Sequence, residues 1–319
     1  MFVVLSLLSQ AMAAPISHYD PAIHDLYQYD ATVTKADPAT PVAYNTSAIP
    51  DGYDFTGVNV RDRRFNNRSP HVSSSTDIND YNSGYVAIVM VSPQHALVSA
   101  HYIDAVPSQM NAVEFMADDG HKVVLEGVSS DIVGPDLKLI TFSEPLPEDA
   151  GIAVYSKFID YATLPVSGMV FGVDSQGRML PRRAVHYWEP YNEEWSFVHT
   201  PFGPITDHLG VIFSGDSGTP LFIADYTGQN YFLGTAYDSD RKIGPEVVAN
   251  INALTALSGY SVEQVDYPYA PVDFDLDGRV TSADLSLLLG AWGTSDETAD
   301  VNGDGVVDGG DFGVFLGYW

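Results

Sequence analysis

The sequence predicts a mainly β protein that ends in a small α-helical unit. From Tyr85 to about residue 258, short apolar runs rich in β-branched residues alternate with turn residues, as in "HALVSA", "LKLITF" and "YFLGTAY". Runs of this length and spacing are typical of an all-β sandwich or barrel. After residue 271 the pattern changes to an acidic stretch that occurs twice and is followed each time by apolar residues at helical spacing.

The composition excludes several classes of function. The chain has 319 residues and no cysteine, so it can form neither a disulfide framework nor a thiolate metal site. Its net charge of −28 comes from 42 acidic and 14 basic residues. Such a chain offers no cationic surface to replace phosphate counterions, so we expect no nucleic-acid partner. The same charge favours solubility and the binding of divalent cations.

The first 13 residues have the pattern of a signal peptide. An apolar run over residues 2–8 leads to an Ala-Met-Ala site at residues 11–13, after which we expect cleavage. A buried strand is the alternative, although Pro15 would end it awkwardly. No other stretch approaches the roughly 20 apolar residues that span a bilayer, so we expect no membrane span. The sequence thus predicts a secreted or extracellular protein, and export without cysteine favours a bacterial source.

Changes in composition divide the chain into five segments. We expect a signal peptide over 1–13, an N-terminal arm or pro-segment over 14–80, a β domain over 81–258, a linker over 259–271 and a metal-binding unit over 272–319. Within the arm, "RDRRFNNR" at 61–68 is either a processing site or a solvated loop that balances local charge. Within the β domain, only residues 247–257 have a pattern that could become helical.

The C-terminal segment contains two copies of one acidic loop. "DFDLDGRVTSAD" (273–284) and "DVNGDGVVDGGD" (300–311) are offset by 27 residues, and both place oxygen-bearing side chains at positions 1, 3, 5, 9 and 12, with glycine at 6. Calcium prefers six to eight oxygen ligands, and the sharp turn at position 6 needs glycine. We therefore expect two Ca2+ sites, with backbone carbonyls contributed at position 7 by Arg279 and Val306. The candidate side-chain ligands are Asp273, Asp275, Asp277, Thr281 and Asp284 in the first loop and Asp300, Asn302, Asp304, Asp308 and Asp311 in the second.

An apolar stripe at spacing i, i+3, i+4, i+7 follows each loop, so we expect two loop–helix units that pack face to face. The stripes are Leu285, Leu288, Leu289 and Trp292, then Phe312, Phe315, Leu316 and Trp319. An acidic low-complexity tail is the alternative. The repeats resemble a type I dockerin, in which position 12 is Asp. This resemblance implies attachment to a cohesin-type scaffold or cell-surface partner; a calcium-stapled terminus without a partner is the alternative.

Three motifs in the β segment supply the residue types of nucleophilic catalysis. Ser-Ala-His ends at His101, Asp136 directly precedes the run "LKLITF", and Ser217 lies in Gly-Asp-Ser-Gly-Thr-Pro. A serine nucleophile needs a base and an acid that orients the base. Each residue has an ordinary structural alternative: a core histidine, a turn-capping aspartate with Asp131 as the rival acid, and a turn serine.

The order and the context of these motifs resemble the trypsin-like (chymotrypsin-fold) serine proteases over residues 80–258. The resemblance implies two six-stranded antiparallel β-barrels, with Ser217 as nucleophile, His101 as general base and Asp136 as the orienting acid. It also implies an oxyanion hole formed by the backbone N–H groups of Gly215 and Ser217. No cofactor takes part in this catalysis.

Three departures from the family pattern affect this interpretation. Thr219 replaces a glycine, the cysteines beside the histidine and serine are missing, and no activation-site motif supplies a partner for Asp216. By the resemblance, the specificity pocket would involve Val211 and Tyr237, which favours apolar or small residues before the scissile bond.

The sequence therefore predicts a secreted serine endopeptidase that acts on protein or peptide substrates and carries a dockerin-like calcium module. Two rivals remain. The β domain could be an inactive protease-like binding protein displayed through the calcium module, or an esterase that uses the same triad.

Overall fold

A computed structural model gives the structure of the chain. It describes residues 27–29, 41–44, 49, 53–58, 87–100, 112–164, 169–173, 179–183, 185–189, 192–196, 219–235 and 241–319. The expected signal peptide and the arginine cluster at 61–68 lie outside these residues.

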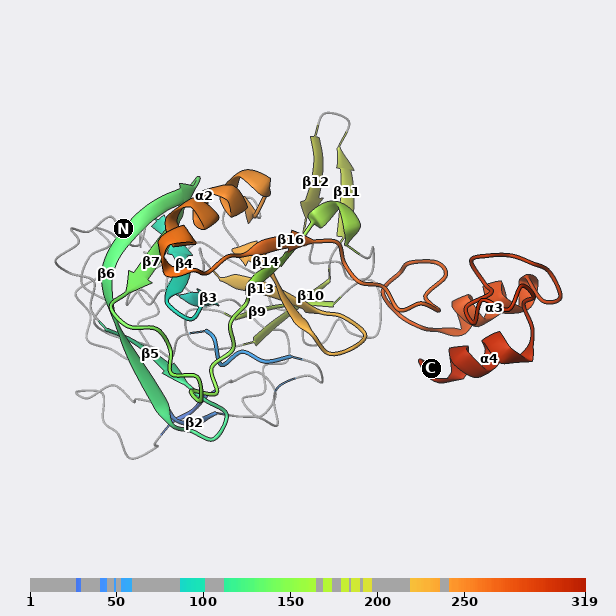
Figure 1. Ribbon diagram of the computed structural model, residues 1–319, viewed down its shortest axis with the longest axis horizontal. Helices are drawn as coiled ribbons and strands as arrows, with labels where there is room; N and C mark the ends of the chain where they lie inside the picture. The colour runs from blue at the N-terminus through green and yellow to red at the C-terminus, as the bar shows by residue number, and fades with distance from the viewer. Residues whose placement is uncertain are drawn as a thin grey trace, which may run out of the picture.

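The first sheet is antiparallel and curls into a half-barrel (Figure 1). Its five strands follow the order β3-β4-β7-β6-β5. The curl follows β6, whose first half pairs with β5 and whose second half pairs with β7, with register shifts near Gly127 and Ile132. Such irregularities bend a strand and increase its twist. The strands are β3 (Val89–Ser92), β4 (His95–Ser99), β5 (Ala112–Met116), β6 (Lys122–Gly134) and β7 (Leu137–Phe142).

The second sheet has seven strands in the order β10-β9-β13-β14-β8-β16, with β15 also paired to β14. Its strands are β8 (Lys157–Ile159), β9 (Met169–Val173), β10 (Met179–Arg183), β13 (Pro220–Ala224), β14 (Asn230–Thr235), β15 (Arg241–Lys242) and β16 (Glu263–Val265). Two separate hairpins pair β1 (Tyr27–Tyr29) with β2 (Pro41–Tyr44) and β11 (Val185–Glu189) with β12 (Asn192–Ser196). A 3-10 turn, η5 (Tyr161–Thr163), follows β8.

These sheets correct part of the expected architecture. The protein is mainly β, as predicted, but the described strands form sheets of five and seven rather than two barrels of six, and neither sheet closes within the described residues. The pairing is also not entirely antiparallel, because β8 runs parallel to both β14 and β16. β8 and β16 are three residues long, which is too short for an apolar period to reveal their partners.

The main core lies between the two sheets. Leu97 and Leu139 of the first sheet share it with Phe222 and Phe232 of the second, and all four side chains are buried. Phe55, from a segment before the first sheet, is buried in the same cluster. Separate cores lie within the first half-barrel and on the opposite face of the second sheet. One continuous apolar cluster therefore joins the two sheets.

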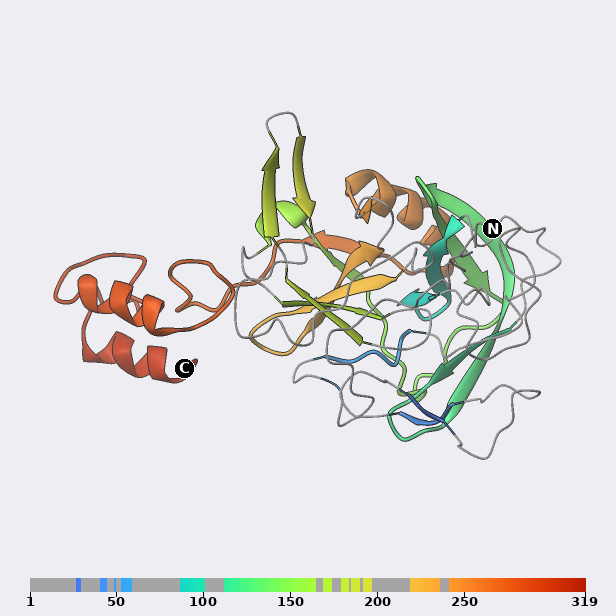
Figure 2. The same ribbon diagram turned by 180° about the vertical axis from the view of Figure 1, so that it is seen from behind.

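Helix α2 (Pro245–Thr255) covers the end of the first sheet, and Figure 2 shows it from behind, beside β6. Its pattern also fits a strand, but Pro245 is at the start of the helix and Val247, Ile251 and Thr255 are buried at intervals of four residues. The side chain of Asn250 donates to the carbonyl of Val133 on β6, at 3.0 Å. A 3-10 turn, η6 (Ala256–Ser258), ends the helix.

Part of the segment expected to be a linker packs on the β sheets. Residues 263–265 form β16, and Val262 and Tyr267 are buried. Tyr269 donates its hydroxyl to the carbonyl of Thr163 at 2.8 Å. The polar residues and two prolines of 259–271 predict a linker, but the apolar and aromatic side chains of this segment make these contacts.

The C-terminal unit lies at one end of the molecule, where α3 (Ser282–Gly290) and α4 (Gly309–Leu316) run side by side in both ribbon views. Its own small core contains five buried residues: Val272, Leu288, Ala299, Val307 and Phe315. The two helices were expected from the apolar stripes, and each begins directly at the end of an acidic loop.

Candidate functional site

Asp136 occupies a strained position in the hairpin that joins β6 to β7. Gly134 pairs with Leu137, so Pro135 and Asp136 form a two-residue turn. Asp136 has φ 54°, in the left-handed region that residues other than glycine rarely adopt. Proline followed by a residue with positive φ is the signature of a type II turn. Strained residues of this kind are enriched at active sites.

The same turn lies directly beside the end of β4, the strand that leads to His101. Ser99 pairs with Leu137, and the backbone N–H of Ala100 donates to the carbonyl of Asp136 at 2.8 Å. The candidate acid and the residue before the candidate base are therefore in contact, although they are 36 positions apart in the chain.

The rival acid, Asp131, lies farther along β6. It pairs with Leu139, which in turn pairs with Leu97 in the middle of β4, and its side chain is exposed. Asp131 is thus two ladder positions from the strand end at which Asp136 meets Ala100. This arrangement favours Asp136 over Asp131 as the partner of a group that follows β4.

The remaining candidate catalytic and pocket residues, His101, Val211, Gly215, Ser217 and Tyr237, lie outside the described residues. Residues near two of them are described, namely Ala100 before His101 and Thr219 two positions after Ser217. Ser99 is fully buried, and its hydroxyl makes no hydrogen bond within the part of the chain that the structure describes. Buried hydroxyl groups are nearly always hydrogen-bonded. We therefore expect a polar group from outside the described residues to bind the Ser99 hydroxyl at the end of β4.

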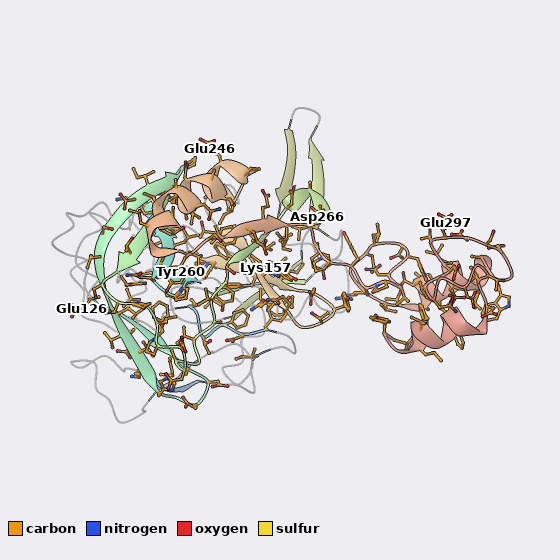
Figure 3. The ribbon with its side chains drawn as sticks, in the orientation of Figure 1. Glu126, Lys157, Glu246, Tyr260, Asp266 and Glu297 are labelled. Carbon is orange, nitrogen blue, oxygen red and sulfur yellow. The ribbon has the colours of Figure 1, made fainter. Side chains whose placement is uncertain are left out.

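The strand that follows the candidate nucleophile belongs to the second sheet. Thr219 is buried directly before β13, and Phe222 on β13 shares the main core with Leu137, the residue after Asp136. The segments next to the acid and to the nucleophile therefore pack into one core from opposite sheets. The carboxylate residue Glu246 does not belong to this core, because it is exposed on the first turn of α2, as Figure 3 shows.

The first acidic loop of the C-terminal unit gathers three carboxylates. Oxygen atoms of Asp273, Asp275 and Asp277 lie within 4.8 Å of one another, so this group could hold a metal ion. Asp273 is 3% exposed. Burial, together with the negative charges of Asp284 and Asp277, raises the pKa of Asp273 to about 6. A divalent cation would relieve this crowding of like charges, so the residues present fit a cation of the calcium type.

A fully buried aspartate at position 12 organises each loop. Asp284 accepts hydrogen bonds from the N–H groups of Phe274 at 2.8 Å and Thr281 at 2.8 Å. Asp311 does the same for Asn302 at 3.2 Å and Asp308 at 2.7 Å. The backbone hydrogen bond from Asp308 is the main cause that lowers the pKa of Asp311.

The predicted ligands at positions 7 and 9 have additional structural roles. Thr281 and Asp308 are the N-caps of α3 and α4, and each forms a reciprocal capping box with the position-12 aspartate. At position 7, the backbone N–H groups of Arg279 and Val306 donate to Asp277 at 2.9 Å and to Asp304 at 3.1 Å.

In the second loop, Asp300 anchors the turn in the same way as Asp273. It accepts from the N–H groups of Asp304 at 3.1 Å and Gly305 at 2.8 Å. Asp273 correspondingly accepts from Asp277 at 3.1 Å and Gly278 at 2.9 Å. The two loops therefore share one hydrogen-bonding framework, as the repeated sequence predicts.

The apolar stripes are only half used in packing. Leu288 and Phe315 are buried, whereas the i+4 and i+7 members of each stripe are exposed: Leu289 at 52%, Trp292 at 46%, Leu316 at 53% and Trp319 at 60%. Trp292 and Trp319 also lie beyond the helix ends at Gly290 and Leu316. The expected face-to-face packing thus buries the first part of each stripe and leaves matched apolar side chains exposed on both helices.

Sequence reasoning missed two features of the first loop. Leu276, at position 4, has φ 55°. Burial is the main cause that raises the pKa of the Tyr267 and Tyr269 hydroxyls, and the nearby charge of Asp273 adds to it. The glycine at the matching position of the second loop, Gly303, is the signal that could have revealed the first feature.

No protein-family model matches this chain, and no curated protein matches it. Among the described residues, no helix has the length and apolar character needed to cross a membrane.

Proposed function

We propose that this protein is a secreted serine endopeptidase in which Ser217 attacks the peptide carbonyl, His101 transfers the proton and Asp136 orients the imidazole. The observation that carries the proposal is the 2.8 Å hydrogen bond from Ala100 to Asp136. It supports the proposal because a triad requires its acid beside its base, and Ala100 is the residue before His101.

The strained turn at Asp136 gives independent support. A hairpin turn with positive φ at its third residue favours glycine, and aspartate, which tolerates this region better than most residues, places a carboxylate there. We infer that the hairpin aims Asp136 at the segment after β4. The backbone N–H groups of Gly215 and Ser217 would then stabilise the oxyanion, and Val211 and Tyr237 would line the specificity pocket.

Fluorophosphonate labelling of the exported protein tests this proposal. We expect the wild-type protein to be labelled and Ser217→Ala not to be labelled. Ser214→Ala is the matched control, since it removes a serine from the same motif and should leave labelling intact. Labelling that persists in Ser217→Ala would rule out Ser217 as the nucleophile.

A second pair of variants tests the acid. Asp136→Asn should slow labelling by roughly 10²–10⁴-fold because it removes the charge that stabilises the imidazolium. Asp131→Asn, on the same hairpin, should label at the wild-type rate. The reverse result would assign the role to Asp131.

Substrate turnover separates an endopeptidase from the two rivals. A peptidase should cleave peptides with an apolar or small residue before the scissile bond. An esterase would hydrolyse short acyl esters and leave peptides intact, and an inactive binding protein would do neither.

We further propose that residues 272–319 form a dockerin-like module that binds two calcium ions. Asp273, Asp275, Asp277 and Asp284 would hold the first ion, and Asp300, Asn302, Asp304 and Asp311 the second. Bound calcium would supply the positive charge that holds each acidic loop in one conformation. The exposed Leu289, Trp292, Leu316 and Trp319 support a protein partner, such as a cohesin-type scaffold or a cell-surface protein.

Two measurements test this module. Calcium titration by calorimetry should show two bound ions per chain, and no binding heat would contradict the calcium sites. Capture on an immobilised type I cohesin should be lost in Leu289→Ser/Leu316→Ser, whereas Glu297→Ser, on the exposed outer side in Figure 3, should be captured normally. Failure of the wild-type module to be captured would leave it as a calcium-stapled terminus.

A further inference from the structure

A short segment of the N-terminal arm, residues 53–58, packs into the core between the two sheets. Phe55 and Val58 are 0% and 1% exposed, and Thr56 is 2% exposed. The arm as a whole has the composition of a loop or a pro-segment, so this burial was not expected from the sequence. We call residues 53–58 the strap.

The strap is bound to the first sheet through its backbone. Val58 forms a β-bridge with Val89 on β3, and the carbonyl of Gly57 accepts from the N–H of Met90 at 2.9 Å. A side chain at Gly57 would not fit, because an added Cβ would lie 2.2 Å from the carbonyl oxygen of Ala153. The sequence of the strap therefore matches the narrow space in which it lies.

Aromatic contacts hold the strap against the second sheet. The ring of Phe55 meets Phe222 of β13 edge-on, with centroids 5.4 Å apart, and Tyr53 meets Phe171 of β9 at 4.6 Å. The side chain of Asn230 on β14 donates to the carbonyl of Asp54 at 2.7 Å. Aromatic pairs of this geometry add to the free energy gained from burying the rings.

The connection between the sheets also binds the strap. The hydroxyl of Tyr155 donates to the carbonyl of Asp54 at 2.6 Å, and the N–H of Ala153 donates to the hydroxyl of Thr56 at 2.8 Å. The strap thus contacts the first sheet, the second sheet and the chain that links them.

From these contacts we propose that the strap is an intramolecular peptide ligand that stays bound when the chain is cut after it. The groove between the sheets recognises its two aromatic side chains, the backbone at Asp54 and Gly57, and the hydroxyl of Thr56. Proteolysis anywhere between residues 59 and 86 therefore yields a two-chain protein and does not release the N-terminal part. This proposal is independent of the proposed catalysis.

The test is a specific cut in the folded full-length protein. A recognition site for a sequence-specific protease is inserted after residue 66, and the protein is cleaved and passed over a size-exclusion column without denaturant. We expect the N-terminal piece to co-elute with the rest of the chain and the thermal unfolding temperature to stay within a few degrees of the uncut protein. Separation of the two pieces at micromolar concentration would overturn the proposal.

Two variants of the cleavable protein measure how much individual strap residues contribute to retention of the N-terminal piece. Phe55→Ala should weaken retention of the N-terminal piece by roughly 100-fold or more, because truncating a buried phenylalanine is costly. Thr56→Val removes the two hydrogen bonds of the Thr56 hydroxyl, the one donated to Asp54 and the one accepted from Ala153. It should weaken retention at least about tenfold and keeps the test informative if Phe55→Ala does not fold. Leu257→Ala is the matched control, since Leu257 is fully exposed. Equal retention in all variants would show that other parts of the arm hold the piece.

Discussion

The two acidic loops of the C-terminal unit share a hydrogen-bonding framework but differ in their surroundings. In both, position 1 accepts from the N–H groups at positions 5 and 6, and position 12 accepts from N–H groups at position 2 or 3 and at position 9. Asp273, however, is buried beside the tyrosines of the β body, whereas Asp300 is only half-buried. The shared hydrogen bonds follow from the residue types within each loop. The burial of position 1 depends on whether the loop lies next to the β body.

Positions 3 and 4 differ in a second way. The first loop has Asp275 and Leu276, where the second has Asn302 and Gly303. Position 3 therefore carries a negative charge only in the first loop, whereas position 9 carries one only in the second, where Asp308 stands in place of Thr281. Position 4 is a leucine at φ 55° in the first loop and a glycine at φ 73° in the second. The two loops thus place their carboxylates at different positions, and only the first has a strained backbone at position 4.

The largest expected effect tests what the loops share. Asp284→Ala and Asp311→Ala each remove a buried carboxylate that binds loop N–H groups and caps a helix, and both should lower the unfolding temperature of the C-terminal unit by at least about 10 °C. Glu297→Ala, in the exposed connection between the helices, is the control. Differential scanning calorimetry of the three variants measures the unfolding temperature. A large decrease in only one of the two aspartate variants would show that the two loops do not depend equally on position 12.

Calcium affinity tests the difference at position 3. Because position 3 is Asp275 in one loop and Asn302 in the other, Asn302→Asp should tighten binding at the second loop about tenfold, and Asp275→Asn should weaken the first by a similar factor. Isothermal titration measures both. Identical calcium affinities before and after the two substitutions would contradict the prediction. In every variant, chelation of calcium should reduce the helical circular dichroism signal of the unit.

The strained leucine gives a smaller effect. Leu276→Gly should stabilise the calcium-free unit by about 1 kcal/mol, because leucine is costly in the left-handed region and Leu276 is 53% exposed. Gly303→Leu should destabilise it by about the same amount. Urea unfolding of the pair measures the exchange. A loss of stability in Leu276→Gly would mean that contacts of the leucine outweigh its backbone strain.

Asp136 gives the smallest expected change in stability and separates strain from function. It shares the backbone conformation of Leu276, but aspartate tolerates this region better, so Asp136→Gly should stabilise the β body by less than about 1 kcal/mol. The same variant should lose fluorophosphonate labelling. Asp136→Asn, which keeps the side-chain shape, should leave stability unchanged and also lose most labelling. Full labelling of Asp136→Gly would assign the turn a purely structural role.

Local features of the molecule could be predicted from the sequence. The repeated spacing of Asp273 and Asp300, the apolar stripes behind them and the runs that form β4, β7, β13 and β14 depend on residues close together in the chain. The turn at Pro135 and Asp136 is equally local. These patterns predict the structure because the residues that define each pattern are also the residues that interact within the loop, helix or turn.

Features that depend on distant contacts could not be predicted. The parallel pairing of β8 with β16 joins two runs of three residues that show no apolar period. Phe55 lies in a short segment of mixed composition, and the apolar residues near it, such as Tyr53 and Val58, are too few to indicate a core. For the candidate triad, the sequence supplies the residue types, and only the pairing of β4 with β7 brings Ala100 to Asp136.

The junction between the β body and the C-terminal unit has a mechanical consequence. Tyr269 is bound to Thr163, Val272 is already in the core of the C-terminal unit, and the N–H of Asp273 donates to the carbonyl of Ala270 at 3.0 Å. A flexible linker of ten residues would let its ends wander about 17 Å apart. This junction is instead short and held by contacts on both sides. A partner that binds the C-terminal unit therefore also fixes the orientation of the β body.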